Sequence, residues 1–126
     1  MRLPTRHKPL RDLPGVAGTA RVDRRTGALV PRLQAGDIAV IDHLDLDREH
    51  AEALVDSGVV AVVNASAFIS GRYPNLGPDL LARSGVLMLD DVGPGVFSAV
   101  RDGSRVRVVD GELLVGEERV ASGREL

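Results

Sequence analysis

Three short, fully apolar runs constrain the fold of this chain most, and each is bounded by turn residues. They are Ile38–Ile41, Val59–Val63 and Val86–Leu89. Runs of this length and composition are typical of buried strands. The segments between them carry helical features, so strands and helices alternate along this part of the chain. A strand–helix–strand crossover is right-handed and places its strands parallel. This pattern predicts an α/β fold with a small parallel sheet.

Two short helices are expected between these strands. Asp45 is a good N-cap for a helix over 46–57, because its side chain can accept a hydrogen bond from a free N–H group. Asp47 and Glu49 would then lie in the first turn, where the helix dipole favours negative charge. The second helix is expected to open at Gly77-Pro78, since proline suits the first helical position. A glycine follows each segment and is expected to end the helix.

Shorter β elements are expected on either side of this core. Residues 1–18 are rich in Pro, Gly and Arg without periodicity, which predicts a basic irregular arm before a single domain over 19–126. Ala20–Asp23 and Leu29–Leu33 flank Arg24-Arg25-Thr26-Gly27 and together predict a hairpin. Three more short strands are expected further on, at Arg105–Val109, Glu112–Val115 and Glu118–Ala121. These hairpins are candidates for a second β layer.

Composition excludes several classes of function. Aromatic residues make up 2% of the chain, so it is poorly equipped to stack bases and we expect no nucleic-acid partner. The chain has no cysteine, which removes disulfides, thiolate metal sites and cysteine nucleophiles. No apolar run reaches the ~20 residues that a membrane-spanning helix needs.

The net charge of −2 conceals an uneven distribution. Basic residues dominate the first 33 positions, and acidic residues outnumber arginines in the rest. Such a split is typical of a basic arm on an acidic body. We expect the arm to be solvated or folded against that body; contact with an anionic membrane is the alternative.

The order of predicted elements resembles the swivelling β/β/α domain, whose closest analogue is the mobile phosphohistidine domain of enzymes that use phosphoenolpyruvate. In those domains the loop after the second strand carries a Ser-His pair, and the histidine receives phosphate. The comparable place here reads Ile69-Ser70-Gly71-Arg72, with Gly71 where the histidine would stand. Glycine cannot carry phosphate, so the resemblance implies a shared fold without the transfer chemistry.

Six stretches carry a second and closer resemblance, to the N-terminal domain of SteA-like actinobacterial cytokinetic proteins, which are related to thiamin pyrophosphokinase. The most specific of them is the Ser-Gly-Arg-Tyr-Pro-Asn run. The stretches are Gly15–Gly18, Ala20–Asp23, Gly36–His43, Val62–Ala65, Ile69–Pro78 and Leu89–Gly93.

This resemblance implies a longer protein, in which a thiamin pyrophosphokinase-like region and a hydrophobic, membrane-associated C-terminus follow this domain. It implies a location on the cytoplasmic side at the division septum. It also implies a SteB-like membrane partner and a role in controlling cell-wall hydrolysis during cell separation. The acidic motifs of the pyrophosphokinase region are not found here, so we carry over no catalytic residue.

The best candidate site is the loop that runs into the second helix. Ser70, Gly71, Arg72, Asn75 and Gly77 lie between a strand end and a helix start, where free N–H groups favour an anion. Arg72 adds a fork of donors and Ser70 a hydroxyl, which suits phosphate or carboxylate. The alternative is a loop whose polar groups only satisfy its own backbone.

Secondary candidates follow the ends of the three predicted parallel strands, and therefore share one edge of the sheet. They are Asp42, His43, Asn64, Asp90 and Asp91. Clustered carboxylates there could hold a cation that bridges a phosphate, but solvated turn acids are the favoured explanation. We expect no metal site at 42–47, because Asp45 serves as a helix cap and Asp47 would then point elsewhere. His50 is expected on the surface.

The sequence therefore predicts a non-catalytic regulatory or scaffold domain that binds a partner, or a second copy of itself, through β edges and the 64–78 loop. The alternative is a phosphate- or nucleotide-gripping lid of a thiamin pyrophosphokinase-like enzyme. No cofactor is expected in this domain, and a nucleotide or phosphate ligand would belong to the full-length protein.

Overall fold

A computed structural model describes residues 15–71 and 76–126 of the chain. Its elements, in chain order, are β1 (Val16–Val22), α1 (Thr26–Leu29), the 3₁₀ helix η2 (Val30–Arg32), β2 (Ile38–Ile41), α2 (Arg48–Asp56), β3 (Ala61–Asn64), α3 (Gly77–Arg83), β4 (Leu87–Asp90), α4 (Val96–Ala99), β5 (Arg105–Val109), β6 (Glu112–Val115), β7 (Glu118–Ser122) and β8 (Arg124–Glu125). No helix among these residues is long and apolar enough to cross a membrane.

The strands form one sheet of eight in the order β7-β6-β5-β1-β2-β3-β4-β8. The four central strands, β1 to β4, run parallel, and β2, β3 and β4 are the three predicted apolar runs. Antiparallel strands extend the sheet on both sides, with β5 on β1 and β8 on β4. The predicted mixed α/β fold, with a small parallel sheet, helices and short hairpins, is confirmed.

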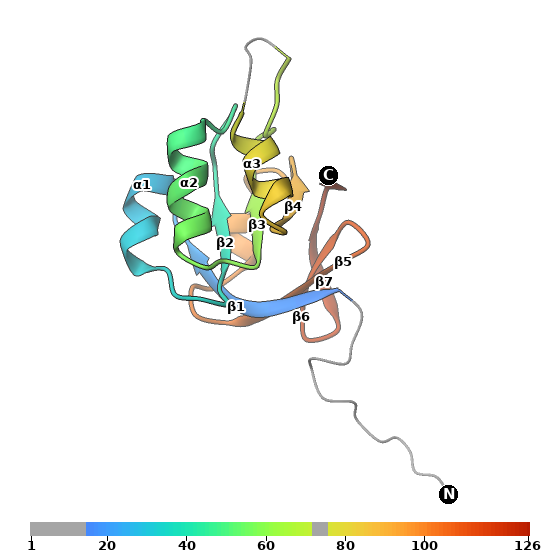
Figure 1. The fold of residues 1–126 in the computed structure, drawn as a ribbon. Helices are drawn as coiled ribbons and strands as arrows, with labels where there is room; N and C mark the ends of the chain where they lie inside the picture. Colours follow the sequence, from blue (N-terminus) through green and yellow to red (C-terminus); the bar gives the residue numbers. More distant parts are fainter. Residues whose placement is uncertain (1–14, 72–75) are drawn as a thin grey trace, which may run out of the picture.

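The central strands are apolar on both faces, so each face packs against its own layer. Ile38 and Val40 of β2 point to one face, and Ala39 and Ile41 to the other. The second face is covered by the helices, through Leu29 of α1, Ala51 and Leu54 of α2, and Leu81 of α3. These helices lie on the same side of the parallel strands (Figure 1).

The first face is covered by the antiparallel strands and by α4. Val106, Val108 and Leu113 of β5 and β6 share one buried cluster with β2 and β3, as do Val96 and Val100. The antiparallel half of the sheet therefore turns over and packs on the parallel half. The second β layer anticipated from the sequence is continuous with the first, because β1 pairs with both β2 and β5.

The predicted hairpin of 20–23 and 29–33 is wrong. Ala28 and Leu29 both donate main-chain hydrogen bonds to the carbonyl of Arg25, which starts α1 and η2 instead of a second strand. The physical reason is that both edges of β1 are already paired, so no edge is left for a hairpin partner. Coiling the segment also buries Leu29 completely beneath the helices.

Two predicted boundaries also move. Strand β1 begins at Val16, so the boundary placed at 18/19 between arm and domain falls too late; residues 1–14 lie outside the described part of the chain. Helix α2 begins at Arg48 and is capped by Asp47, not by Asp45. Asp45 has a φ of 57°, a left-handed conformation in the connection before the helix. Elements α4 and β8 were not predicted.

Candidate functional site

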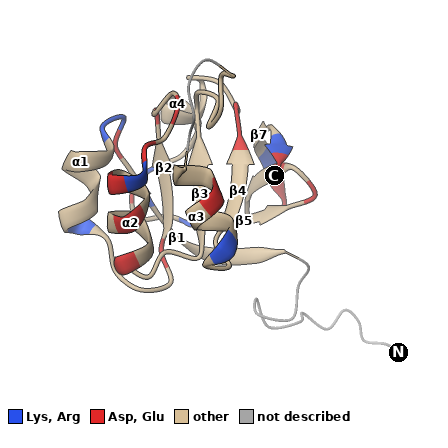
Figure 2. Cartoon of the chain, turned by 45° about the horizontal axis from the view of Figure 1, so that its top comes forward, with Lys and Arg blue, Asp and Glu red and all other residues tan. Residues whose placement is uncertain are grey.

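The carboxyl ends of β2, β3 and β4 bring the secondary candidates to one edge of the sheet, as parallel pairing requires. Charged positions lie on helices α2 and α3 and at the end of β4, while β2 and β3 carry none (Figure 2). Ile41 of β2 is in register with Asn64 of β3, so the residues after them are neighbours. This edge is the natural place to look for a ligand site.

Asn64 clamps this edge. Its side chain is fully buried. Its Oδ1 accepts hydrogen bonds from the main-chain N–H of His43 at 2.9 Å and of Ser66 at 3.1 Å. Its Nδ2 donates to the carbonyl of His43 at 2.8 Å. Both ends of the amide are thus bound to the chain itself, and the side chain fixes the connection after β2 to that after β3.

The acidic candidates also bind their own chain. The hydroxyl of Ser66 donates to the carboxylate of Asp42, which also lies 3.9 Å from an Arg24 nitrogen. Asp90 is buried, and its Oδ1 accepts a hydrogen bond from the N–H of Phe68 at 2.8 Å. The second oxygen of Asp90 lies 3.1 Å from the guanidinium of Arg124.

A shallow pocket of about 270 Å³ opens beside Asp90. It is lined by Asp90, Asp91, Gly123 and Arg124. Asp91 is exposed and has a φ of 56°. The buried carboxylate of Asp90 already faces Arg124 across this pocket, which reduces its capacity to attract a second cation.

In the predicted anion-binding loop, Ser70 faces a carboxylate. The N–H and the hydroxyl of Ser70 both donate to the carboxylate of Asp45, at 2.7 Å each. Negative charge therefore occupies the place where a phosphate was expected, which weakens the electrostatic case for an anion at Ser70. Arg72 and Asn75 lie outside the described residues, as does any contact they make.

The two glycines of this loop have different roles. Gly71 has a φ of 89°, and a Cβ there would meet nothing within 4 Å. Gly77 is buried at the start of α3, where a Cβ would overlap the carbonyl oxygen of Leu46 and lie 2.8 Å from that of Asp47. The close approach of α3 to the start of α2 thus requires glycine at 77.

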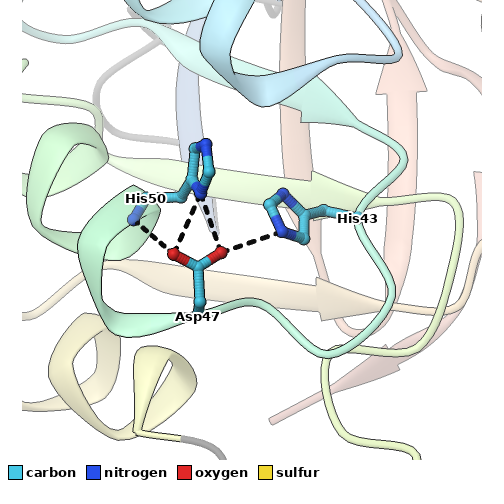
Figure 3. A group of neighbouring side chains, drawn as sticks. All are labelled: His43, Asp47 and His50. Atoms are coloured by element: carbon cyan, nitrogen blue, oxygen red, sulfur yellow. Dashed lines mark hydrogen bonds and ion pairs between the residues drawn. The ribbon is translucent and has the colours of Figure 1, made fainter.

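A second cluster at this edge is formed by His43, Asp47 and His50 (Figure 3). His43 follows β2, Asp47 is the N-cap of α2, and His50 lies three residues into that helix. The Oδ1 atom of Asp47 lies 3.1 Å from Nε2 of His43 and 2.7 Å from Nδ1 of His50. The two imidazole rings meet edge to face, with centroids 4.9 Å apart.

The cluster has unequal titration properties. Burial and the neighbouring His50 lower the pKa of His43 by more than Asp47 and Asp42 raise it, so this pKa lies below its ordinary value and the neutral imidazole is favoured. Burial alone would raise the pKa of Asp47, but hydrogen bonds from the main-chain N–H and the ring of His50 outweigh it and hold that pKa below its usual value. A carboxylate thus lies between two imidazoles.

Sequence reasoning missed two of these three residues. The sequence pattern predicts Asp45 as the cap, which would turn Asp47 away from His43, and it predicts His50 on the surface. One local signal was available. Asp47 lies three residues before His50, the spacing at which an N-cap side chain accepts a hydrogen bond from the helix. The left-handed turn at Asp45 lets the helix start two residues later and brings the three side chains together.

Comparisons with known proteins add one finding on the fold. No protein-family profile and no curated protein matches the chain. A solved structure described as a potential metal-dependent hydrolase with cyclase activity aligns with 93% of this chain and 66% of its own, at a TM-score of 0.54 and 22% identity. This chain thus spans about two thirds of the length of that protein. The two proteins share a fold. At this identity the likeness extends to the fold alone.

Proposed function

We propose that this chain is a non-catalytic regulatory or scaffold domain of a SteA-like cell-division protein, which binds a partner protein at the septum. The observation that carries the proposal is an exposed apolar set at the carboxyl edge of the sheet, here called the apolar rim. It consists of Leu44, Ile69 and Leu76, whose exposed fractions are 57%, 51% and 57%. Large apolar side chains that are exposed on neighbouring segments are typical of protein-binding surfaces.

Contacts of adjacent residues bring the three chain segments of the apolar rim near one another. Leu44 and Ile69 directly precede Asp45 and Ser70, whose side chains are hydrogen-bonded to each other. Leu76 directly precedes Gly77, which packs against the main chain of Leu46. Leu126 is the one other large hydrophobic residue exposed among residues 15–71 and 76–126.

The polar groups around the apolar rim support a binding role rather than a catalytic one. Asn64, Asp42 and Asp90 each bond to other groups of the same chain. Their effect is to hold the connections after β2 and β3 in place, which gives the apolar rim a rigid base. A pre-organised surface loses less conformational entropy when a partner binds.

The proposed occupant is the cytoplasmic segment of a SteB-like membrane partner, presenting apolar side chains. This choice rests on the SteA-like sequence pattern, whose most specific part, from Ser70 onward, adjoins the apolar rim. Full-length protein would then be held at the septal membrane through this contact and through its own C-terminal region.

The test measures by calorimetry how tightly the wild type and two variants bind the purified cytoplasmic segment of the SteB-like partner. The triple variant Leu44→Ser, Ile69→Ser, Leu76→Ser removes the apolar rim, while Leu126→Ser removes an exposed leucine elsewhere. We expect the triple variant to weaken binding by at least about 10-fold and Leu126→Ser to leave it unchanged. Equal binding by both variants, or self-association of the wild type in place of partner binding, would overturn the proposal.

A further inference from the structure

We propose that His43, Asp47 and His50 form a binding site for a divalent late transition metal such as Zn²⁺. One ligand atom from each residue can be chosen so that all lie within 4.8 Å of one another. The inference is independent of the proposed partner-binding role, since it concerns a different group of side chains and a different ligand.

The donor set suits this class of ion. Two imidazole nitrogens and one carboxylate oxygen match the preference of zinc and its neighbours, whereas calcium and magnesium prefer oxygen ligands alone. In a tetrahedral site with bonds of about 2.0–2.1 Å, the ligand atoms lie about 3.3 Å apart. The atoms around Asp47 Oδ1 are now 2.7 and 3.1 Å away, so small side-chain rotations make room for the ion.

The backbone holds the three ligands before any ion arrives. The main-chain N–H and C=O of His43 are both bound by the Asn64 amide. Asp47 is the N-cap residue of α2, and its Oδ2 atom accepts the capping hydrogen bond from the N–H of His50 at 3.0 Å. Asp47 can therefore keep its capping bond through Oδ2 and offer Oδ1 to a metal.

Helix α1 provides the outer contact that a metal-binding histidine needs. The hydroxyl of Thr26, a buried residue, lies 2.7 Å from Nδ1 of His43. Once Nε2 binds an ion, the ring proton resides on Nδ1, and this N–H donates a hydrogen bond to Thr26 Oγ1. Such contacts fix the tautomer and the orientation of the ring.

The site is reachable from solvent and has open positions. The side chains of His43, Asp47 and His50 are 20%, 45% and 39% exposed. Three protein ligands leave a fourth position for water or for a ligand atom of a bound molecule. The competing interpretation is a metal-free hydrogen-bonded cap, in which Asp47 serves only α2 and the two rings.

The experiment is calorimetric titration of the chelator-treated chain with ZnCl₂, followed by thermal unfolding with and without the ion. We expect one Zn²⁺ per chain and a raised melting temperature, because an ion that binds only the folded state stabilises it. Asp47→Asn keeps a residue that is a good N-cap but removes the negative charge of the ligand oxygen. This variant should bind Zn²⁺ at least about 10-fold more weakly than the wild type. His50→Gln and Thr26→Val should weaken binding too.

Two controls make the result decisive. Asp79→Asn removes an exposed carboxylate from another helix, and His7→Gln removes a histidine from the first 14 residues; both should bind Zn²⁺ like the wild type. Melting curves without metal show whether each variant is folded. The metal site would be overturned if the wild type does not bind Zn²⁺ one to one. It would also be overturned if folded Asp47→Asn and His50→Gln variants bind Zn²⁺ as tightly as the wild type.

Discussion

Asn64 and His43 are joined through both groups of the Asn64 amide: Oδ1 accepts from the N–H of His43 at 2.9 Å, and Nδ2 donates to its carbonyl at 2.8 Å. The side chain thus imitates a strand partner just where β2 and β3 stop pairing. It positions His43, which belongs to the histidine cluster and directly precedes Leu44 of the apolar rim.

Replacing Asn64 by Ala should destabilise the domain by about 1–3 kcal/mol, because the partly buried N–H and C=O of His43 would lose their partners. Chemical denaturation measures this free energy of unfolding. Ser98→Ala, a polar-to-alanine change at an exposed position of α4, is the control and should stay within about 0.5 kcal/mol of the wild type. If Asn64→Ala lowers the free energy of unfolding no more than the control does, the two Asn64–His43 hydrogen bonds do not stabilise the fold as proposed.

Gly77→Ala should destabilise the domain by about 1–3 kcal/mol, since the added Cβ overlaps the carbonyl oxygen of Leu46 and forces α3 away from α2. Gly95→Ala is matched to it, because a Cβ at Gly95 meets nothing within 4 Å and its φ is −60°. We expect that variant to be neutral or slightly stabilised. Thermal unfolding of the two variants side by side checks the steric argument.

Asp45 offers a test of backbone strain. Asp45→Ala and Asp45→Gly both lose the two hydrogen bonds to Ser70, but only alanine retains a Cβ at a φ of 57°. We expect the glycine variant to be about 1 kcal/mol more stable than the alanine variant. Equal free energies of unfolding for the pair would show that the left-handed turn relaxes when Ser70 is released.

Asp102 should make folding stability depend on acid pH. Burial alone would raise the pKa of Asp102, but the N–H of Val22 and the guanidinium groups of Arg32 and Arg21 outweigh it and hold that pKa below its usual value. A carboxyl with a lowered folded-state pKa stabilises the fold above its unfolded pKa of about 3.9 and loses that contribution as pH falls through the folded value.

The measurement is the difference in free energy of unfolding between wild type and Asp102→Asn from pH 6 down to about pH 3. The difference should shrink as the pH falls, and it should also shrink at high salt because the carboxylate is partly exposed. Glu117→Gln, an exposed change on a different turn, serves as control. A difference that stays constant across this range would refute the assignment.

Local pattern was enough for the central part of the fold. The apolar run Ile38–Ile41 is β2 with the predicted bounds, and Arg105–Val109 and Glu112–Val115 are β5 and β6 with theirs. A strand that is buried on both faces leaves a continuous apolar run in the sequence. The Asp110-Gly111 turn between β5 and β6 favours a tight hairpin, so both signals are local. The meeting of Asp42, Asn64 and Asp90 at one edge followed from parallel pairing.

The sequence by itself determined which segments must be buried and which polar residues follow the strands. Tertiary structure decided the rest: segment 26–32 coils because both edges of β1 are occupied, and Asp47 caps α2 because Asp45 turns left-handed to meet Ser70. That choice of cap also decides which side chains surround His43. Pairing partners and loop contacts come from residues distant in the chain, and local periodicity does not encode them.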